Sequence, residues 1–364
     1  METVLMFADT LRSPDLRHVV PLGIGDPFVY AEHEGRRVAF LPSIEVPRAR
    51  ELEGLEVVPY EEIGLDELVA RGMTYRQARL ELLARACEHL GLSEAVTPAD
   101  FPLAAADLLR GRGVTLRSDD GFFVNRRRVK TAGELEGVRR AQAAAQIAME
   151  TMRNAIRRGG DISSESLRTE ALREAAGSEA FFEYMIVAHG AQAASVHDSG
   201  SGRVAPAEAI VIDLGVRDWK SGAWADMTRT FSFGPPSKEL ANYQSVCRLV
   251  LEQVTPMVRP RASCAEIYRR ADSIIAEAGY DTLLTKKPGT VLESGFLHSL
   301  GHGVGLEIHE APSVGPSGEE LVAGDLITLE PGVYRKGFGG VRLEDLVLVT
   351  EDGFEVLTDF SYDL

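Results

Sequence analysis

The sequence predicts a two-domain α+β protein, and three observations lead to this fold class. The chain has 364 residues, which exceeds the usual size of one hydrophobic core, so two domains are expected. Residues 1–130 mix short strand-like runs with helix-like runs. After residue 131 a long alanine-rich helical stretch precedes a region, from Ala209 onward, of strands, glycines and polar turns. We therefore expect a small mixed α/β domain over residues 1–130 and a larger catalytic domain over residues 131–364.

Three strands and one helix are expected in the first domain. Strands are predicted at Val4–Phe7, Phe28–Glu32 and Arg37–Phe40, with a hairpin-type turn between the last two. Tyr75–Leu90 has the apolar spacing of an amphipathic helix, which Gly91 would end.

The second domain should begin with a capped helix. Thr131 and Glu134 have the spacing of a capping box. They precede a helical stretch from about Leu135 to Ile156, which the pair Gly159–Gly160 would end. Three further helices are predicted: Ser164–Ala176, Leu240–Val258 and Cys264–Ala278.

Composition excludes several classes of protein. With 39 basic and 55 acidic residues the formal net charge is −16, which disfavours nucleic acid or an anionic membrane as a partner. The one dense basic run, Arg126–Arg128, is interpreted as an exposed turn face. The three cysteines are far apart and odd in number, which argues against a disulfide framework. No apolar run reaches the roughly 20 residues of a membrane span, and no signal peptide is evident. We expect a cytoplasmic protein.

Four acidic residues occupy unusual positions. Asp213 and Glu330 each follow a strongly apolar strand-like run, and Asp226 and Glu344 follow them after 13 and 14 residues inside β-type stretches. A buried acid needs a cation or a metal as partner. Two matched hairpins, each offering two carboxylates, would suit two metal ions about 3.5–4 Å apart. The alternative reading is that each acid caps a turn or pairs with an arginine.

A histidine cluster follows the first pair of acids. Three of the chain's eight histidines, His298, His302 and His309, fall within twelve residues and are interleaved with the glycines of Gly301–Gly305. These glycines would allow close backbone approach and unusual dihedral angles. Imidazole combined with carboxylates favours Mn²⁺, Co²⁺, Fe²⁺ or Zn²⁺ over a pure Mg²⁺ or Ca²⁺ site.

Together these motifs resemble the creatinase/prolidase/methionine-aminopeptidase superfamily, whose catalytic domain has the pita-bread fold. The resemblance covers about residues 130–364, and more weakly the preceding part, which is similar to a creatinase-type N-terminal domain. The blocks that carry it are Asp213–Gly215, Asp226–Thr230, Gly301–Leu306, His309–Glu310, Leu329–Gly332 and Val341–Asp345.

The resemblance implies a role for each site residue. The implied metal ligands are Asp213, Asp226, His302, Glu330 and Glu344. His197, His309 and Glu330 would be catalytic, and His298 and Arg342 would line the substrate pocket. Two divalent ions are implied, with Mn²⁺ favoured and Co²⁺, Zn²⁺ or Fe²⁺ as alternatives.

One spacing departs from the family. Twelve residues separate Asp213 from Asp226, where the family usually has ten. Because strand side chains alternate with period two, an addition of two residues keeps both acids on one face. We expect a longer, exposed hairpin tip.

Within the superfamily, the N-terminal extension and the complete ligand set favour hydrolysis of the bond before proline. The first choice is an Xaa-Pro dipeptidase (prolidase) that uses a metal-bridging hydroxide. The alternative is an Xaa-Pro aminopeptidase (aminopeptidase P) that acts on longer peptides. A remote alternative is a non-catalytic binding module of the same fold, which would typically have lost ligands. By the same resemblance a homodimer is expected.

Overall fold

The computed structural model describes residues 2–363, and the chain divides into two compact units. The first ends at Arg127 and the second begins at Arg128. Each unit has hydrophobic core clusters of its own. The expected boundary, after residue 130, lies three residues beyond this observed boundary.

The first unit is built on a six-stranded sheet with the strand order β4-β3-β2-β1-β5-β6. Its strands are β1 (Val4–Ala8), β2 (Phe28–His33), β3 (Arg36–Leu41), β4 (Glu56–Pro59), β5 (Glu94–Thr97) and β6 (Thr115–Ser118). Its helices are α1 (Pro14–Val19), α2 (Val46–Ala49), the 3-10 turn Tyr60–Ile63, α3 (Leu65–Ala70), α4 (Tyr75–Leu90), α5 (Leu103–Gly111) and α6 (Asp120–Arg128). The three predicted strands and the predicted helix are confirmed.

The turn between β2 and β3 is tighter than the sequence suggested. His33 pairs directly with Arg36, so only Glu34 and Gly35 form the turn. Both have positive φ, at 50° and 78°, as a two-residue hairpin turn that follows the strand twist requires.

Helices and strands alternate in blocks in the second unit. The helices are α7 (Ala132–Arg158), α8 (Ser164–Glu174), α9 (Lys238–Val254) and α10 (Cys264–Glu277), with 3-10 turns at Ala175–Gly177, Gly190–Ala194 and Thr255–Met257. The strands are β7 (Ala180–His189), β8 (Ala209–Asp218), β9 (Trp224–Ser232), β10 (Ser294–Gly295), β11 (Gly301–Gly303), β12 (Glu310–Val314), β13 (Leu326–Leu329), β14 (Gly332–Arg335), β15 (Gly339–Arg342), β16 (Asp345–Val349) and β17 (Phe354–Val356).

The four predicted helices of this unit are present. The Thr131–Glu134 capping box is complete and starts α7 at Ala132, three residues earlier than expected. The α-helix α9 ends at Val254, short of the predicted Val258, and Pro256 lies in the 3-10 turn that follows. Proline lacks an amide hydrogen, which explains the early end of the helix.

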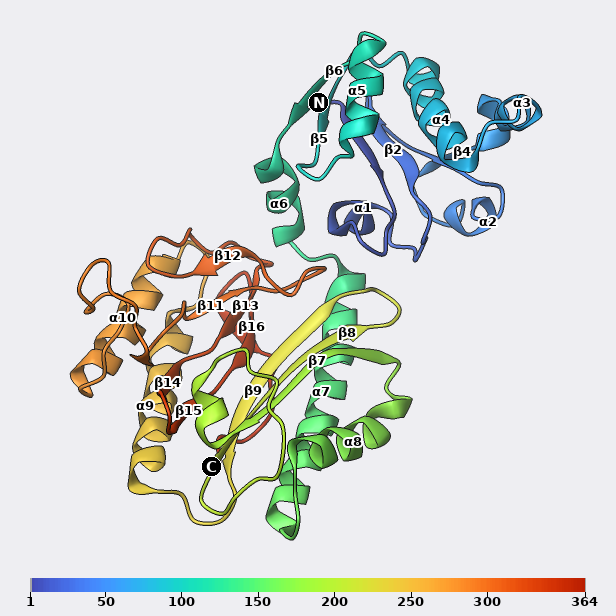
Figure 1. The fold of residues 1–364 in the computed structure, drawn as a ribbon. Helices are drawn as coiled ribbons and strands as arrows, with labels where there is room; N and C mark the ends of the chain where they lie inside the picture. The colour runs from blue at the N-terminus through green and yellow to red at the C-terminus, as the bar shows by residue number, and fades with distance from the viewer. Residues whose placement is uncertain (1, 364) are drawn as a thin grey trace. The chain divides into compact units, whose positions relative to one another are not determined.

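The strands of the second unit lie between two pairs of helices (Figure 1). Three sheets have the orders β7-β8-β9, β10-β14-β15 and β12-β11-β13-β16-β17. Helix α7 packs on β8 and β9, and α8 packs on β7, whereas α9 packs on β14 and β15 and α10 packs on β12. The site described below lies where these strands meet.

The basic run that ends α6 is not an exposed turn face, so that prediction is wrong. Arg127 and Arg128 are buried. Arg127 Nε lies 2.7 Å from Asp15 Oδ1, and Arg128 Nη2 lies 2.7 Å from Asp325 Oδ2. The acids that neutralise this run are distant in sequence, so inspection of the run itself could not reveal them.

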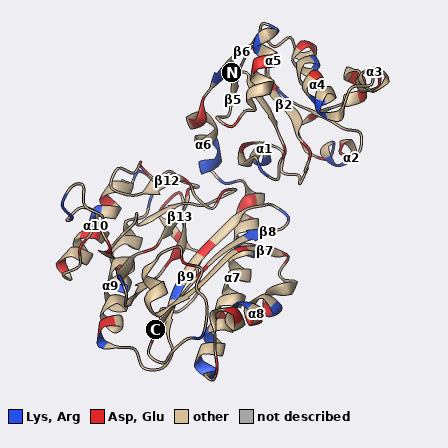
Figure 2. Cartoon of the chain, in the orientation of Figure 1, with Lys and Arg blue, Asp and Glu red and all other residues tan. Residues whose placement is uncertain are grey.

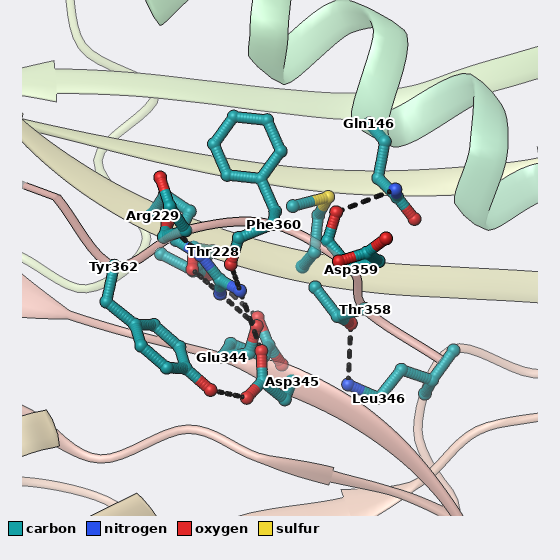
Figure 3. A network of polar contacts seen from close by, with 12 residues as sticks. Gln146, Thr228, Arg229, Glu344, Asp345, Leu346, Thr358, Asp359, Phe360 and Tyr362 are labelled. Atoms are coloured by element: carbon teal, nitrogen blue, oxygen red, sulfur yellow. Dashed lines mark hydrogen bonds and ion pairs between the residues drawn. The ribbon is translucent and has the colours of Figure 1, made fainter. Parts of the chain in front are cut away.

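One buried ion pair joins β9, β16 and the C-terminal segment (Figure 3). The side chains of Arg229 and Asp345 are 1% and 2% exposed, and Arg229 Nη2 lies 2.8 Å from Asp345 Oδ1. The same guanidinium donates to the carbonyls of Glu344 at 2.7 Å and Phe360 at 2.9 Å. The hydroxyl of Tyr362 donates to the other oxygen of Asp345. This network fixes the backbone of β9 and β16 next to Glu344.

No helix in the described part of the chain has the length and apolar character needed to cross a membrane.

Replacing Arg229 with methionine should destabilise the fold strongly. The change leaves the buried Asp345 carboxylate without its cation, which typically costs about 3–5 kcal/mol. Arg248→Met is the matched control, because the Arg248–Glu252 pair is exposed and such pairs are worth at most about 1 kcal/mol. Urea unfolding of the metal-free proteins measures both changes. Equal losses of stability in the two variants would contradict a central role for the Arg229–Asp345 pair.

Candidate metal centre

The first two acids are held on one face of the hairpin β8–β9. Asp226 pairs with Gly215 and Asp213 pairs with Thr228 across the antiparallel ladder. Because Asp213 and Gly215 share a face, Asp226 lies diagonally across from Asp213 on that same face. The hairpin therefore keeps both acids together, as expected, and Trp219 and Lys220 at its tip are exposed. Red segments mark the acidic positions on the ribbons of β8 and β9 (Figure 2).

The other two acids lie at a break between two sheets. β13 pairs with β16, but β14 pairs with β15 in a different sheet. Glu330 follows β13, and Glu344 lies between β15 and β16. Both pairings nevertheless have the same antiparallel register, so the predicted second hairpin is present and places Glu330 opposite Glu344 at the break. The prediction that Glu344 lies inside a strand is wrong. The pattern of apolar residues continues across the break, which is why the sequence read as one hairpin.

Main-chain hydrogen bonds tie Glu344 to the strand that carries Asp226, and Glu330 to the segment that precedes His302. The amide of Glu344 donates to the carbonyl of Thr228 on β9 at 3.0 Å, and the amide of Glu330 donates to the carbonyl of Leu300 at 2.7 Å. The hydroxyl of Thr228 also donates to Glu344 Oε2 at 2.7 Å. The positions of the acids are thus set by the backbone.

His302 has the orientation of a metal ligand. Its Nδ1 lies 3.0 Å from the carbonyl oxygen of Gly303, which can only accept, so Nδ1 carries the proton. The unprotonated Nε2 lies 3.7 Å from Asp226 Oδ2 and 3.6 Å from Glu330 Oε1. Ligand atoms of Asp226, His302 and Glu344 all lie within 4.8 Å of one another. A hydrogen bond that fixes the tautomer in this way is usual for metal-binding histidines.

The alternate glycines around His302 serve close packing. A Cβ at Gly301, Gly303 or Gly305 would overlap, respectively, the carbonyl of Thr328, the carbonyl of Ala311 or the carboxylate of Glu310. None of the three is among the glycines with positive φ. The prediction of close approach is confirmed, and that of unusual dihedral angles is wrong.

The acids and histidines open into one cavity of about 810 Å³, within the usual range for a small-molecule site. All nine side chains singled out from the sequence line it: His197, Asp213, Asp226, His298, His302, His309, Glu330, Arg342 and Glu344. Ile186, Val196, Leu297 and Ile308 form apolar walls. His309 is exposed, and its ring meets the ring of His302 edge-on, with 4.2 Å between centroids.

Burial and the repulsion of neighbouring carboxylates raise the pKa values of Asp226, Glu330 and Glu344. Burial, with Asp213 nearby, raises the pKa of Glu344 to about 8. Burial and the Glu344 carboxylate hold the pKa values of Asp226 and Glu330 well above their usual range. Burial lowers the pKa of His298 to about 3 and that of His302 to about 4. The raised pKa values show that the site disfavours several ionised carboxylates without a compensating positive charge, and the lowered ones keep the imidazoles neutral and able to bind metal. The site therefore fits divalent cations.

Arg342 is the one arginine or lysine among the described residues that line the cavity, and it is already engaged. Its guanidinium forms an ion pair with Asp213 Oδ2 and donates to the hydroxyl of Tyr334 at 3.1 Å and to Thr228 Oγ1 at 3.2 Å. Asp213 Oδ1 is buried and has no hydrogen-bond partner, as expected for an atom that faces a cation. This single guanidinium cannot neutralise four carboxylates.

Two tyrosines support the site and were not found from the sequence. The hydroxyl of Tyr184 donates to Asp226 Oδ1 at 2.7 Å, and that of Tyr334 lies 3.0 Å from His298 Nε2. Each ring occupies space that a glycine leaves open, because a Cβ at Gly215 or Gly332 would overlap it. The glycine two residues after each strand-end acid was the available signal, but nothing in the sequence connected it to a tyrosine.

These features define a metallohydrolase: a cluster of buried carboxylates with neutral histidines at the base of a substrate-sized cavity. The model for metallopeptidase family M24 matches residues 136–351, and the chain belongs to this family. The predicted enzyme class, a metal-dependent peptidase, is thereby confirmed.

Individual relatives and solved structures agree with this assignment. The chain is 32% identical over 250 residues to an Xaa-Pro dipeptidase of Lactobacillus delbrueckii subsp. lactis, covering 67% of this chain and 63% of that protein. The Xaa-Pro dipeptidase structure from Bacillus anthracis superposes with a TM-score of 0.82, at 22% identity and with 100% and 94% of the two chains covered. The X-Pro aminopeptidase structure from Thermotoga maritima gives 0.80, at 21% identity with 100% and 98% covered. These likenesses confirm the pita-bread fold and its additional N-terminal domain.

The stability of the metal-free protein should fall between about pH 6.5 and pH 8. Glu344 has a pKa of about 8 in the folded chain and about 4.3 when unfolded. The folded state therefore holds more protons than the unfolded state in this window, and stability decreases as pH rises. Below about pH 6.5 the lowered pKa values of His298 and His302 act in the opposite sense. Thermal melting of the metal-free protein measures the effect, and Glu344→Gln should flatten it. A melting temperature that rises across this window would contradict the raised pKa values.

Proposed function

We propose that this protein is an Xaa-Pro dipeptidase that hydrolyses the peptide bond before proline and uses two divalent metal ions. The observation that carries the proposal is the convergence of three buried acids, the partly buried Glu330 and His302 on one cavity of about 810 Å³. A cavity of that size suits a dipeptide-sized ligand. The relative named an Xaa-Pro dipeptidase, at 32% identity, supports the choice of substrate.

The five proposed metal ligands are Asp213, Asp226, His302, Glu330 and Glu344. The raised pKa values of three of these acids and the unpaired Asp213 Oδ1 support this assignment. When bound, the divalent cations supply Lewis acidity and a water molecule that ionises near neutral pH. The mixture of carboxylate and imidazole favours Mn²⁺, with Co²⁺, Zn²⁺ and Fe²⁺ as alternatives. Retention of all five ligands argues against a non-catalytic binding module.

The remaining polar groups would act on the substrate. A carboxylate oxygen of Glu330 exchanges a proton with the attacking water and delivers it to the leaving nitrogen. The ring of His309 donates a hydrogen bond to the scissile carbonyl oxygen as negative charge develops on it. The ring of His197 orients the leaving amine. His298, which lies beside Tyr334, forms part of the substrate wall. Arg342 holds Asp213 in place.

An Xaa-Pro aminopeptidase is a second candidate, and one observation favours it. A dipeptide ends in a free carboxylate beside the proline ring. Arg342 is the sole lysine or arginine among the described cavity residues, and its guanidinium is engaged with Asp213 and Tyr334. A substrate whose proline continues into a longer peptide presents no charge at this point. We further propose a cytoplasmic homodimer, following the expectations from the family resemblance.

His302→Ala and His309→Ala should have different effects. Loss of the His302 imidazole should lower metal content and activity together. Loss of His309 should lower kcat by about 10²-fold, the effect typical of losing one oxyanion donor, and metal content should persist at about two equivalents per chain. Elemental analysis and steady-state kinetics measure both properties. Full kcat in the His309→Ala enzyme would contradict its proposed role.

A paired assay separates the two candidate activities. The Mn²⁺- or Co²⁺-loaded protein is incubated with an Xaa-Pro dipeptide and with an Xaa-Pro-Xaa tripeptide, and release of the first residue is quantified. Turnover of the dipeptide alone is expected for the proposed dipeptidase. Release of the first residue from the tripeptide would favour the aminopeptidase. If the metal-loaded protein cleaved neither peptide, the assignment to Xaa-Pro bonds would be wrong.

A further inference from the structure

The segment of residues 190–208 joins β7 to β8 and carries one proposed catalytic group. Val196, His197 and Ser199 of this segment line the cavity. The His197 side chain is exposed, and in the part of the chain that the structure describes no hydrogen bond holds its ring. The direction of the His197 ring therefore depends on the conformation of the segment that carries it.

A second histidine, His189, lies at the start of this segment and is buried. Its Nδ1 lies 2.8 Å from Glu208 Oε2, and its Nε2 lies 3.1 Å from the carbonyl oxygen of Ser201. His189 is the last residue of β7, Ser201 follows the cavity-lining part, and Glu208 is the last residue before β8. One imidazole thus joins the beginning, the middle and the end of the segment.

Neighbouring contacts reinforce this staple, which consists of His189, Ser201 and Glu208. Glu208 Oε2 also accepts a hydrogen bond from the amide of Ala205 at 2.9 Å. Gly190 has φ of +52°, and a Cβ there would overlap the Glu208 carboxyl group. The side chain of Gln192 donates to the Ser201 carbonyl and accepts from the Ser201 amide, each at 3.1 Å. Both ends of the stretch that carries His197 are therefore tied to His189.

We propose that His189, through Glu208 and Ser201, is a positioning residue that holds His197 in its place at the cavity. His189 does not itself line the cavity, so it acts through the segment. The proposal rests on the role assigned above to His197. Displacement of a catalytic group by about 1 Å can cost up to roughly 100-fold in rate, so a mobile segment should have a measurable cost.

A double-mutant cycle tests the coupling. The full-length, Mn²⁺-loaded variants His189→Ala, His197→Ala and the double variant are compared with the parent protein, using the better of the two Xaa-Pro peptides. We expect His189→Ala to lower kcat about tenfold, with metal content unchanged. The double variant should match His197→Ala within about twofold, because residues that act through one another are not additive. Multiplied losses in the double variant, or full kcat in His189→Ala, would overturn the proposal.

Two further variants separate positioning from general damage. His189→Asn retains a donor near the position of Nδ1 and should recover most of the kcat lost in His189→Ala. Asp161→Ala removes the exposed Arg203–Asp161 pair, which tethers the same segment outside the staple, and it should leave kcat within about twofold of the parent. An equal loss in Asp161→Ala, or no recovery in His189→Asn, would contradict a specific role for the staple.

Amide hydrogen exchange tests the staple without relying on activity. In His189→Ala, peptides that cover residues 190–205 should exchange faster, whereas those of β8 and β9 should not change. Unchanged exchange in the segment would refute the staple even if the protein is an active peptidase. Faster exchange in a protein that cleaves neither peptide would refute the proposed function and retain the staple. A His197→Ala variant with full kcat would show that the role of His197 is wrong, and the proposal that depends on it would fail too.

Discussion

Four carboxylates share one cavity with a single guanidinium, and much of the second unit can be understood from this constraint. If Asp213, Asp226, Glu330 and Glu344 were all ionised, Arg342 would leave most of their charge uncompensated. Burial then raises the pKa values of three of these groups. Divalent cations resolve the conflict, since they replace the missing positive charge without adding bulk. The protein must therefore hold the acids together against their repulsion until the metal binds.

The backbone network next to Glu344 supplies that restraint. Arg229 follows Thr228, and its guanidinium binds both the carbonyl of Glu344 and the carboxylate of Asp345. Glu344 is thereby held from two sides, by Thr228 and by Arg229. Compared with a well-packed apolar pair in the same place, a buried ion pair of this kind adds little stability, although removal of only one partner is costly. Its location, next to two of the acids, indicates that its contribution is to geometry.

The sequence predicted those parts of the structure that local patterns encode. The helix caps at Thr131 and Gly91, the hairpin β8–β9 and the gathering of nine polar residues around one cavity all follow from spacing and from family motifs. Features that depend on contacts between residues far apart in the sequence were not predicted. The exposed-turn reading of Arg126–Arg128 failed because Asp15 and Asp325 are far away in the chain. Tyr184 was not predicted because the glycine that accommodates its ring, Gly215, belongs to another strand. Tyr334 lies two residues from Gly332 on the same strand, but its contact with His298 depends on a distant segment. The interruption of the strands at Glu330 and Glu344 was not predicted, because the strands on its two sides belong to different sheets but share one apolar pattern.

Glu344 is hydrogen-bonded to Thr228 through both its main chain and its side chain. These two bonds have a consequence for the evolution of the protein. The register of the strands determines the distances between the acids, and substitutions in the cavity walls do not alter this register. Leu297 and Ile308 line the cavity and are not paired with any of the acids in a strand ladder, so their side chains are free to vary in size. Substitutions in the cavity wall can therefore change which peptides bind while the acids keep their positions. Substrate preference can diverge without any change in the catalytic mechanism.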